Sequence, residues 1–304
     1  MKFLPVSMQK YLPYLTFLLL ALAWGCTFVF IKIANEFISA EQIAFYRVFL
    51  GFLLVAVYGI ISKSFEREHL KHWKHLIAIA VLASLMHFLF FAKGTVLLNS
   101  GIAGALSGSI PLFAFVLSIA FIKEEHATWV KLGGILLGFL GVVLIANPFN
   151  AGAGSANLYG VMYLLLGSAA VGASFVYAKK YIAPLGISVI ALTAYQLGLG
   201  LLMMIPFIDF TGILNVWSTP KAIASTIIGL GLINTAIASI AYYYVVDKLG
   251  AVRASSVTYL PPVIAMIIAV FLLGEEIQTL DYIALALIFA GMLLLREKTA
   301  SEPL

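Results

Sequence analysis

The chain has 304 residues, of which 63% are hydrophobic and 10% are charged, with a net charge of +5 and a mean hydropathy of +1.08. A soluble domain carries about 45–50% apolar and about 25% charged residues, so this composition excludes an ordinary soluble protein and indicates a polytopic membrane protein. The pI near 9.1 does not by itself indicate nucleic-acid binding, because basic residues of membrane proteins gather in cytoplasmic loops. The one cysteine, Cys26, excludes an internal disulfide.

The predicted elements are ten apolar helices, each close to the ~20 residues that cross a bilayer. The first run is too long for a signal peptide and has no small-x-small cleavage site after it, so we expect it to be the first span. The connections are short and rich in helix breakers, and no soluble domain fits between them. In chain order the predicted helices cover residues 12–34, 40–62, 76–98, 102–122, 129–147, 158–180, 188–208, 222–247, 252–274 and 279–296.

The basic residues divide unevenly between the two sides of these ten helices. Fourteen of the 18 Lys and Arg residues fall on one side and Lys221 alone on the other, while Lys32, Arg47 and Lys93 fall inside predicted spans. The positive-inside rule then predicts that both termini and the 63–75 loop are cytoplasmic.

The second half of the sequence repeats the first at an offset of about 150 residues. Five helices per half is an odd number, so the second half enters the membrane from the opposite side, and we expect inverted five-helix repeats over 1–150 and 151–304. In secondary transporters of this plan the substrate lies near the midplane between the halves. The matching positions are Pro111 and Pro261, Glu125 and Glu275, Gly141 and Gly291, and the segments "GCTFVFIK" from Gly25 and "GASFVYAK" from Gly172.

The chain resembles the ten-helix EamA branch of the drug/metabolite transporter superfamily over nearly its whole length. The resemblance rests on "WGCTF" from Trp24, "FYRVF" from Phe45, "LPPVIAMIIAVFLLGE" from Leu260, and Gly291. It departs at "IKEE", residues 122–125, where the family usually has Leu-Gly-Glu. The resemblance implies transport of small metabolites, often export of amino acids or related compounds.

Five side chains with useful chemistry are predicted at mid-membrane depth: Trp24, His87, Ser109, Asn234 and Tyr259. An apolar cavity with few polar groups is the usual form of a small-molecule site. This mixture suits an amphipathic metabolite, such as an amino acid or an aromatic compound, better than a phosphate-rich one. For each aromatic residue, and for His87, packing within the bundle is the competing interpretation.

Arg47 is predicted on the second helix, about 10 Å below the membrane surface. A charge at that depth is costly unless it faces protein or water. It is interpreted either as an anchor for an anionic group or as part of a fixed ion pair or carbonyl contact. Its repeat partner is Gln196, so one half alone carries this charge. Lys32 and Lys93 are expected to snorkel toward the outer surface, and Lys32 is spaced to pair with Glu36.

Pro111 and Pro261 are predicted in mid-span, where each removes one backbone hydrogen bond and favours a kink. The kinks are interpreted either as gating elements or as static features of the bundle. The glycines of the fifth helix are interpreted either as sites of close helix packing within one chain or as a dimer interface; they are Gly133, Gly134, Gly138 and Gly141.

The sequence therefore predicts a secondary transporter that moves a small metabolite across the inner membrane by alternating access, with export favoured. An importer of an anionic or vitamin-like compound that uses Arg47 and Lys93 is the alternative. A remote alternative is an intramembrane enzyme built on Ser109 or Ser168, but no paired base or Gly-x-Ser-Gly motif supports it. No cofactor, metal or nucleic acid is expected, and the oligomer is a monomer or a homodimer.

All 13 acidic residues fall at helix ends or in loops. Ion-driven carriers often place a carboxylate within the membrane, so facilitated diffusion or exchange is expected. His87 is the alternative proton carrier.

Overall fold

The protein is all-helical in the part that the structure, a computed structural model, describes: residues 6–122, 128–146, 157–249 and 256–295. The first half contains α1 (Val6–Ala34), α2 (Ala40–Ile61), α3 (Trp73–Ala80), α4 (His87–Leu97), α5 (Ser100–Ser107), α6 (Ile110–Phe121) and α7 (Trp129–Ala146). The second half contains α8 (Leu158–Tyr177), α9 (Val189–Met204), α10 (Pro220–Ala222), α11 (Ala238–Leu249), α13 (Pro261–Leu273) and α14 (Thr279–Leu295). Within the described residues, each of the ten predicted segments coincides with one of these helices or with consecutive helices; residues 147, 252–255 and 296 of the predicted segments lie outside the described part.

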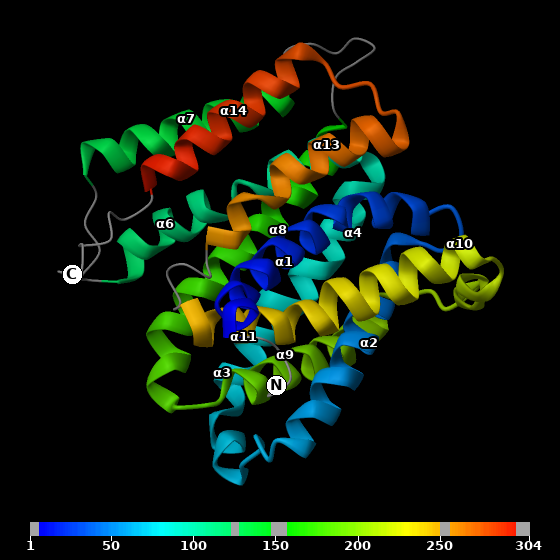
Figure 1. Cartoon of the computed structure of the whole chain (residues 1–304), viewed down its shortest axis with the longest axis vertical. Helices are drawn as coiled ribbons and strands as arrows, with labels where there is room; N and C mark the ends of the chain where they lie inside the picture. Colours follow the sequence, from blue (N-terminus) through cyan, green and yellow to red (C-terminus); the bar gives the residue numbers. More distant parts are fainter. Residues whose placement is uncertain (1–5, 123–127, 147–156, 250–255, 296–304) are drawn as a thin grey trace.

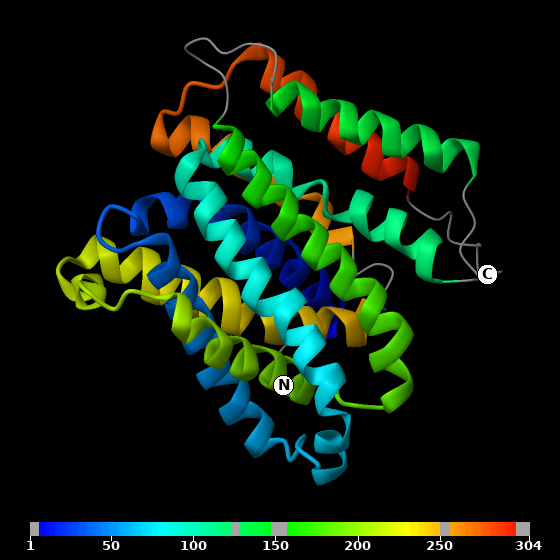
Figure 2. The same cartoon turned by 180° about the vertical axis from the view of Figure 1, so that it is seen from behind.

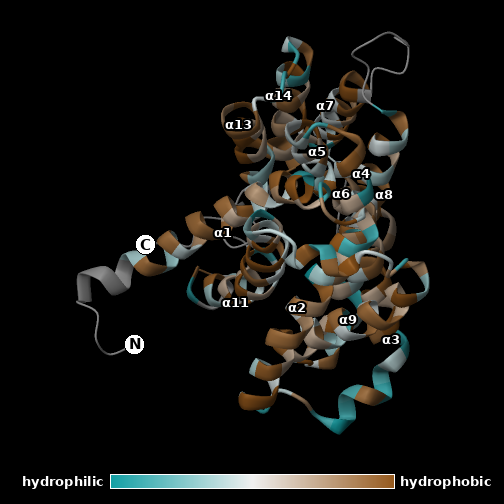
Figure 3. Cartoon of the chain, turned by 90° about the vertical axis from the view of Figure 1, so that its right-hand side faces the viewer, coloured by the Kyte–Doolittle hydropathy of each residue, from teal (hydrophilic) through white to brown (hydrophobic). Residues whose placement is uncertain are grey.

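In the described part of the chain, seven helical stretches are long and apolar enough to cross a membrane, and three shorter apolar helices accompany them. The seven are Tyr11–Ala34, Ala40–Ile61, Arg67–Leu97, Ser100–Phe121, Leu158–Leu185, Val189–Phe207 and Pro220–Tyr242. Most of the ribbon has the colour of hydrophobic residues (Figure 3). Large apolar side chains such as Leu136, Leu202 and Phe271 are exposed on the outside of the bundle. An apolar exterior of this extent indicates a lipid environment. The count of ten crossings stays a prediction.

The third predicted helix begins earlier than its hydropathy indicated. A 3₁₀ helix, η1 (Arg67–His72), leads directly into α3, so most of the expected 63–75 loop is helical. The physical reason is local pairing: the His69 ring nitrogen Nδ1 accepts the backbone N–H of Glu66 at 3.4 Å, which fixes the first turn of η1. His75 consequently lies in a helix, where Nδ1 is 2.8 Å from the Tyr177 hydroxyl.

Two of the long helices contain π-helical segments at related places. The segment η2 (Val81–Met86) joins α3 to α4, and η7 (Ile223–Ile237) joins α10 to α11. Shifted by 150 residues, η2 falls within η7. Extra residues in a helical turn change which side chains face a neighbour, and such segments often occur at functional sites.

α7 and α14 lie side by side at one edge of the bundle (Figure 1). A Cβ atom on Gly134 would approach the Gly291 carbonyl oxygen, and one on Gly291 would approach the Gly134 carbonyl, so the two backbones touch. The predicted close packing is confirmed for Gly134, Gly138 and Gly141, whereas Gly133 has open space beside it.

Some helix contacts in the first half have a counterpart at the repeat-related position of the second half. A Cβ on Gly25 in α1 would overlap Ile264 in α13, and a Cβ on Gly172 in α8 would overlap Ala114 in α6. α4 runs beside α8 (Figure 2), and the corresponding helix α11 packs on α1. Related positions of the two halves therefore make related contacts. The inverted relation of the halves stays a prediction.

Candidate substrate site

A closed chain of side-chain contacts links α1, η7, α2 and α4 in the interior of the bundle. Asn234 on η7 donates from Nδ2 to the hydroxyl oxygen of Thr27 on α1, at 3.0 Å. The next residue, Thr235, accepts a long hydrogen bond of 3.5 Å from Nε of Arg47 on α2. η7 can approach α2 because Gly51, one turn beyond Arg47, leaves room for the Thr235 methyl group.

Aromatic contacts complete the chain of contacts from Arg47 back to α1. The Arg47 guanidinium carbon lies 4.9 Å from the centroid of the Phe88 ring. The His87 ring stacks on Phe88 at 4.6 Å and meets Phe91 edge-on at 4.8 Å. Phe91 in turn contacts Phe28 on α1, with 6.1 Å between ring centroids. We call these eight residues the polar–aromatic ring: Thr27, Phe28, Arg47, Phe88, Phe91, His87, Asn234 and Thr235.

Arg47 is a buried charge without an acidic partner among the residues that the structure describes. Its side chain is 4% exposed, and its printed contacts are the Thr235 hydroxyl and the Phe88 ring. A guanidinium carries five N–H donors, so most of its hydrogen-bonding capacity is unused. Of the two interpretations of Arg47, the fixed ion pair or carbonyl contact is not found in the described part of the chain.

Asn234 has one satisfied and one unsatisfied amide atom. Nδ2 is bound to Thr27, while the buried oxygen Oδ1 has no hydrogen-bond partner among the residues that the structure describes. Ser84, at the corresponding place in η2, also has a buried hydroxyl oxygen without a partner. Buried acceptors are normally paired, so Asn234 Oδ1 is a candidate for a ligand contact.

The other predicted central residues lie beside the ring or away from it. Trp24 is half-buried one turn before Thr27 and contacts Tyr242 on α11, with 5.8 Å between ring centroids. Tyr259, in η8 (Ser256–Tyr259), packs on the hydrophobic cluster that contains Phe28 and Phe91. Ser109 is fully buried, and its hydroxyl donates to the Leu106 carbonyl of its own segment at 2.7 Å.

The two prolines lie where helices restart. α5 ends at Ser107 and α6 begins at Ile110, with Pro111 in its first turn. In the second half, Pro261 is the first residue of α13, directly after η8 and Leu260. Proline is favoured in a first helical turn because its missing N–H has no partner there in any case. The structure thus contains an interruption at both positions, and a gating role remains a prediction.

The spacing of Lys32 and Glu36 permits a pair, but the structure gives the two residues other partners. Lys32 donates from Nζ to the Val96 carbonyl oxygen at 3.3 Å, and Glu36 pairs with Lys221 at 2.7 Å. Glu36 is at the end of α1 and turns away from Lys32 because the helix stops at Ala34. Lys93 is also paired, with Glu41 at 2.9 Å. The charge of Lys93 is therefore balanced by a carboxylate, whereas the contact of Lys32 is with a neutral backbone carbonyl.

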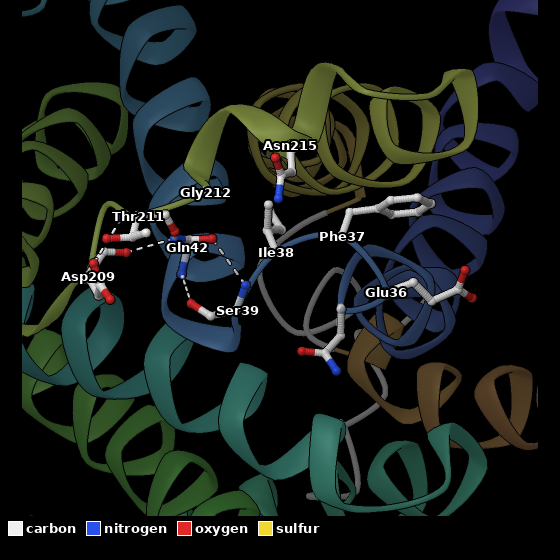
Figure 4. Close-up of a pocket in the computed structure, with 10 residues that line it drawn as sticks. Glu36, Phe37, Ile38, Ser39, Gln42, Asp209, Thr211, Gly212 and Asn215 are labelled. Carbon is white, nitrogen blue, oxygen red and sulfur yellow. Dashed lines mark hydrogen bonds between the residues drawn. The ribbon is translucent and has the colours of Figure 1, made fainter.

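A polar cavity of about 320 Å³ lies between the α1–α2 connection and the segment after α9 (Figure 4). The Gln42 side chain joins the two segments that line the cavity. Its Oε1 accepts the Ser39 N–H. Its Nε2 donates to the carbonyls of Asp209 and Thr211, at 2.7 and 2.8 Å. The N–H of Thr211 bonds to the Asp209 carboxylate at 2.9 Å and lowers the pKa of that group below its usual value. The cavity is lined by Asn35, Glu36, Phe37, Ile38, Ser39, Gln42, Asp209, Thr211, Gly212 and Asn215.

Sequence reasoning identified Arg47, His87 and Asn234 but missed their direct partners Thr27, Thr235 and Phe88. Thr27 lies in the repeated segment from Gly25, and that repetition was its available signal. The π-helical geometry that turns Asn234 and Thr235 toward α1 and α2 has no local sequence signature. The apolar, lipid-facing helices and the interior polar–aromatic ring together define a helical membrane protein with a candidate small-molecule site.

Comparison with known proteins identifies the family. A sequence model described as the EamA-like transporter family matches residues 12–147 and 158–296. An uncharacterized transporter of Archaeoglobus fulgidus is 28% identical over 278 residues, covering 90% of this chain and 95% of the relative. The uncharacterized inner membrane transporter YedA of Escherichia coli is 27% identical, covering 90% and 87%. The chain belongs to the EamA-like transporter family, and a general transport role follows.

Two further proteins also align over most of this chain. The uncharacterized transporter YdfC of Bacillus subtilis is 29% identical, covering 83% of this chain and 80% of its own. A crystal structure aligns over 93% of this chain and 95% of its own with a TM-score of 0.59 at 20% identity. At that identity the match shows the fold alone.

Proposed function

We propose that the protein is a secondary transporter that carries a small amphipathic metabolite across the inner membrane by alternating access, with export favoured. The observation that carries the proposal is the buried polar–aromatic ring, which joins three helices of the first half to η7 of the second. Transporter sites commonly lie where two repeats meet. YedA's description as an inner membrane transporter supports the same location.

The proposed mechanism exchanges the conformations of the two halves. The related contacts of Gly25 with Ile264 and of Gly172 with Ala114 support it, because equivalent packing lets each half adopt the other's arrangement. Both termini are proposed to be cytoplasmic. In two described contacts, residues predicted on the same side of the membrane meet each other. Lys221 pairs with Glu36 at the predicted outer side, and Lys180 donates to the Phe121 carbonyl at the predicted cytoplasmic side.

An amino acid or a related aromatic compound is the proposed substrate. Thr27, Asn234 and Arg47 offer a few polar contacts, while Phe28, Phe88 and Phe91 supply apolar surface, which is the usual mixture of a small-molecule site. The ring contains no carboxylate among its eight members, which supports exchange or facilitated diffusion over ion coupling. His87 remains the candidate proton carrier.

Import of an anionic compound is the second candidate function. The structure leaves fewer cations that could bind such a substrate. Lys93 is neutralised by Glu41, so an anionic substrate would rely on Arg47 alone. The enzyme alternative has little support, because the Ser109 hydroxyl bonds to a backbone carbonyl rather than to a base.

The test is transport by the full chain in proteoliposomes, using metabolites first found to change in cells with and without the protein. Trp24→Ala and Asn234→Ala should raise the substrate concentration for half-maximal transport without lowering expression. Lys32→Met, which removes a contact to the Val96 carbonyl outside the ring, should leave transport near the wild-type value. Wild-type affinity in both central variants would refute the site.

A further inference from the structure

We propose that the contacts of Gln42 form a releasable latch at the proposed outer end of α2, and that α2 and α9 separate there by pivoting on an apolar hinge at their other end. The latch joins α2 to residues 208–213, the segment after α9, which we call the strap. The inference rests on the proposed alternating access and assigns it one moving contact of this chain.

Gln42 uses all the polar atoms of its side-chain amide. The residue is 3% exposed. Its Oε1 accepts the N–H of Ser39 in the capping box of α2, and its Nε2 donates to the carbonyls of Asp209 and Thr211. An amide nitrogen has two N–H donors, and here both bind the backbone of the other half. The amide therefore ties the first turn of α2 to the strap.

The same face of α2 holds the strap at a second place. Residues four apart share a helix face, and the Tyr46 hydroxyl donates to the Ile213 carbonyl at 3.1 Å. Phe45 meets Phe210 of the strap edge-on, with 5.6 Å between ring centroids. The hydrogen-bond acceptors are backbone carbonyls, so the attachment depends on the shape of the strap rather than on its side chains.

The strap keeps that shape through bonds of its own. The N–H of Thr211 bonds to the Asp209 carboxylate at 2.9 Å. Gly212 has a φ of 75°, in the left-handed region that favours glycine, and its carbonyl accepts the N–H of Asn215 at 2.9 Å. Because the strap is fixed internally, it does not deform to follow α2, and the contacts with α2 break together.

Water can replace these contacts when they break. The polar cavity of about 320 Å³ lies beside them and is lined in part by Gln42 and Thr211 (Figure 4). Asn35 and Asp209 in its lining are exposed. A hydrogen bond that opens into a dry interior leaves both groups unpaired at the full desolvation cost, whereas one that opens into water loses only its small net contribution. The latch is therefore reversible.

The opposite end of the α2–α9 pair has a different chemistry at the corresponding positions. Ser188 caps α9 as Ser39 caps α2, and each hydroxyl accepts the N–H three residues further on, at 3.3 Å. At this offset of 149 residues Gln42 corresponds to Ala191. Ala191 is fully buried and has no side-chain donor, so it cannot form a latch of this kind.

Apolar packing takes the place of the latch at that end. Ala191 and Ile187 belong to a buried cluster against which Phe65 packs, and Phe65 meets Tyr195 edge-on at 5.4 Å. The Tyr195 hydroxyl is 3.4 Å from Nδ1 of His69, a longer contact than those of Gln42. Separation here would expose apolar surface to water. This end therefore stays packed as a hinge while the latch end moves.

The experiment measures how fast a buried cysteine reacts at each end of α9, in the purified full chain with Cys26→Ser. Ile208→Cys reports on the strap and Ile187→Cys on the hinge, and the two isoleucines are 8% and 9% exposed. The reagent is 2-(trimethylammonium)ethyl methanethiosulfonate, a water-soluble cation that reacts with accessible thiols. When closing is faster than labelling, the rate follows the population of the open form.

Gln42→Glu keeps the acceptor for Ser39 but sets an oxygen against the two strap carbonyls. We expect it to raise the labelling rate at Ile208→Cys at least about fivefold. The rate at Ile187→Cys should not change, because the hinge does not depend on Gln42. An equal rise at both positions would instead show general loosening of the fold.

Two milder variants keep the test independent of any folding defect in Gln42→Glu. Tyr46→Phe removes one strap bond and keeps the ring, so labelling at Ile208→Cys should rise about threefold. Tyr195→Phe, at the repeat position of Tyr46, is the matched control and should leave that rate unchanged. Ser39→Ala removes the cap but not the strap bonds, and should also leave it unchanged.

A cross-link tests whether transport requires the latch to open. In proteoliposomes, Gln42→Cys paired with Thr211→Cys and bridged by a short bis-methanethiosulfonate should stop transport of the metabolite found by profiling, and reduction should restore it. The same bridge between Phe65→Cys and Tyr195→Cys, whose rings are in contact across the hinge, should leave transport running.

The inference is overturned if Gln42→Glu and Tyr46→Phe leave labelling at Ile208→Cys unchanged, if labelling rises equally at Ile187→Cys, or if the bridged latch still transports. Each of these results would leave the proposed transport function standing. Labelling that changes as expected in a chain that transports no metabolite would support the latch and count against the proposed function.

Discussion

At the scale of single residues, the hydroxyl of Thr27 sets the orientation of Asn234. We expect Thr27→Val, which keeps the shape and removes the acceptor, to leave Asn234 Nδ2 unpaired and to destabilise the protein by about 1–3 kcal/mol. Unfolding in mixed detergent measures this loss. Thr16→Val on the same helix is the control, because Thr16 bonds to the Leu12 carbonyl of its own helix, and a larger effect there would contradict the assignment.

The pair between Lys93 and Glu41 is partly shielded, with side chains 30% and 27% exposed. We expect a double-mutant cycle with Lys93→Met and Glu41→Gln to give a coupling of about 0.5–1 kcal/mol. The pair between Lys71 and Glu68, at 70% and 69% exposure, should give a coupling near zero because water screens it. Equal coupling energies for the two pairs would indicate that Lys93 and Glu41 do not form a stable ion pair.

Depth along a helix was predictable for Arg47, His87 and Asn234, because counting residues from a span's end gives depth directly. Their partners were not predictable. A helix that is apolar on all sides gives no periodic signal for which face meets which neighbour. Lys32 shows the consequence: its spacing to Glu36 was right for a pair, yet the helix ends at Ala34 and Glu36 meets Lys221 instead.

At the scale of elements, the contact between α7 and α14 depends on glycine at particular faces. A Cβ on Gly134 would lie 2.9 Å from the Gly291 carbonyl oxygen, whereas one on Gly133 meets nothing within 4 Å. Gly134→Ala should therefore cost about 1–3 kcal/mol through forced separation of the helices. Gly133→Ala should be neutral, or stabilising by up to about 1 kcal/mol through helix propensity. Equal unfolding curves for the two neighbours would refute the contact.

Helix positions followed from the sequence because length and hydropathy suffice to define a membrane helix. The interruptions near Pro111 and Pro261 were also foreseeable from the properties of proline. The π-helical segments η2 and η7 were not, because nothing in their apolar composition distinguishes them from an ordinary α-helix.

At the scale of the whole molecule, the basic residues predict which face is cytoplasmic. In a Cys26→Ser background, Ser218→Cys near Lys221 should react with an impermeant maleimide in intact cells. Ser62→Cys, at the end of α2, should react only after permeabilisation. Both positions are exposed, so access to the reagent decides the result. The reverse pattern would invert the proposed orientation.

The last prediction concerns closure of the face to which Ser218 belongs. The Glu275 carboxylate accepts the N–H groups of Ser100 and Gly101 at 2.9 and 3.2 Å, which fastens the segment after α13 to the first turn of α5. This contact joins the two halves and would have to break when that side opens. Glu275→Gln keeps the shape but replaces charge-assisted hydrogen bonds, which are roughly twice as strong, by neutral ones.

We therefore expect Glu275→Gln to raise the labelling rate of Ile102→Cys, a position 8% exposed in α5, by about tenfold, in the same Cys26→Ser background. Glu276→Gln is a matched control, because Glu276 contacts Asn99 through its backbone carbonyl alone in the described structure, so its side-chain charge should matter little. Equal labelling in the two variants would show that Glu275 caps α5 without restraining the halves. A rise confined to Glu275→Gln would place this carboxylate among the contacts that hold the transporter closed on one side.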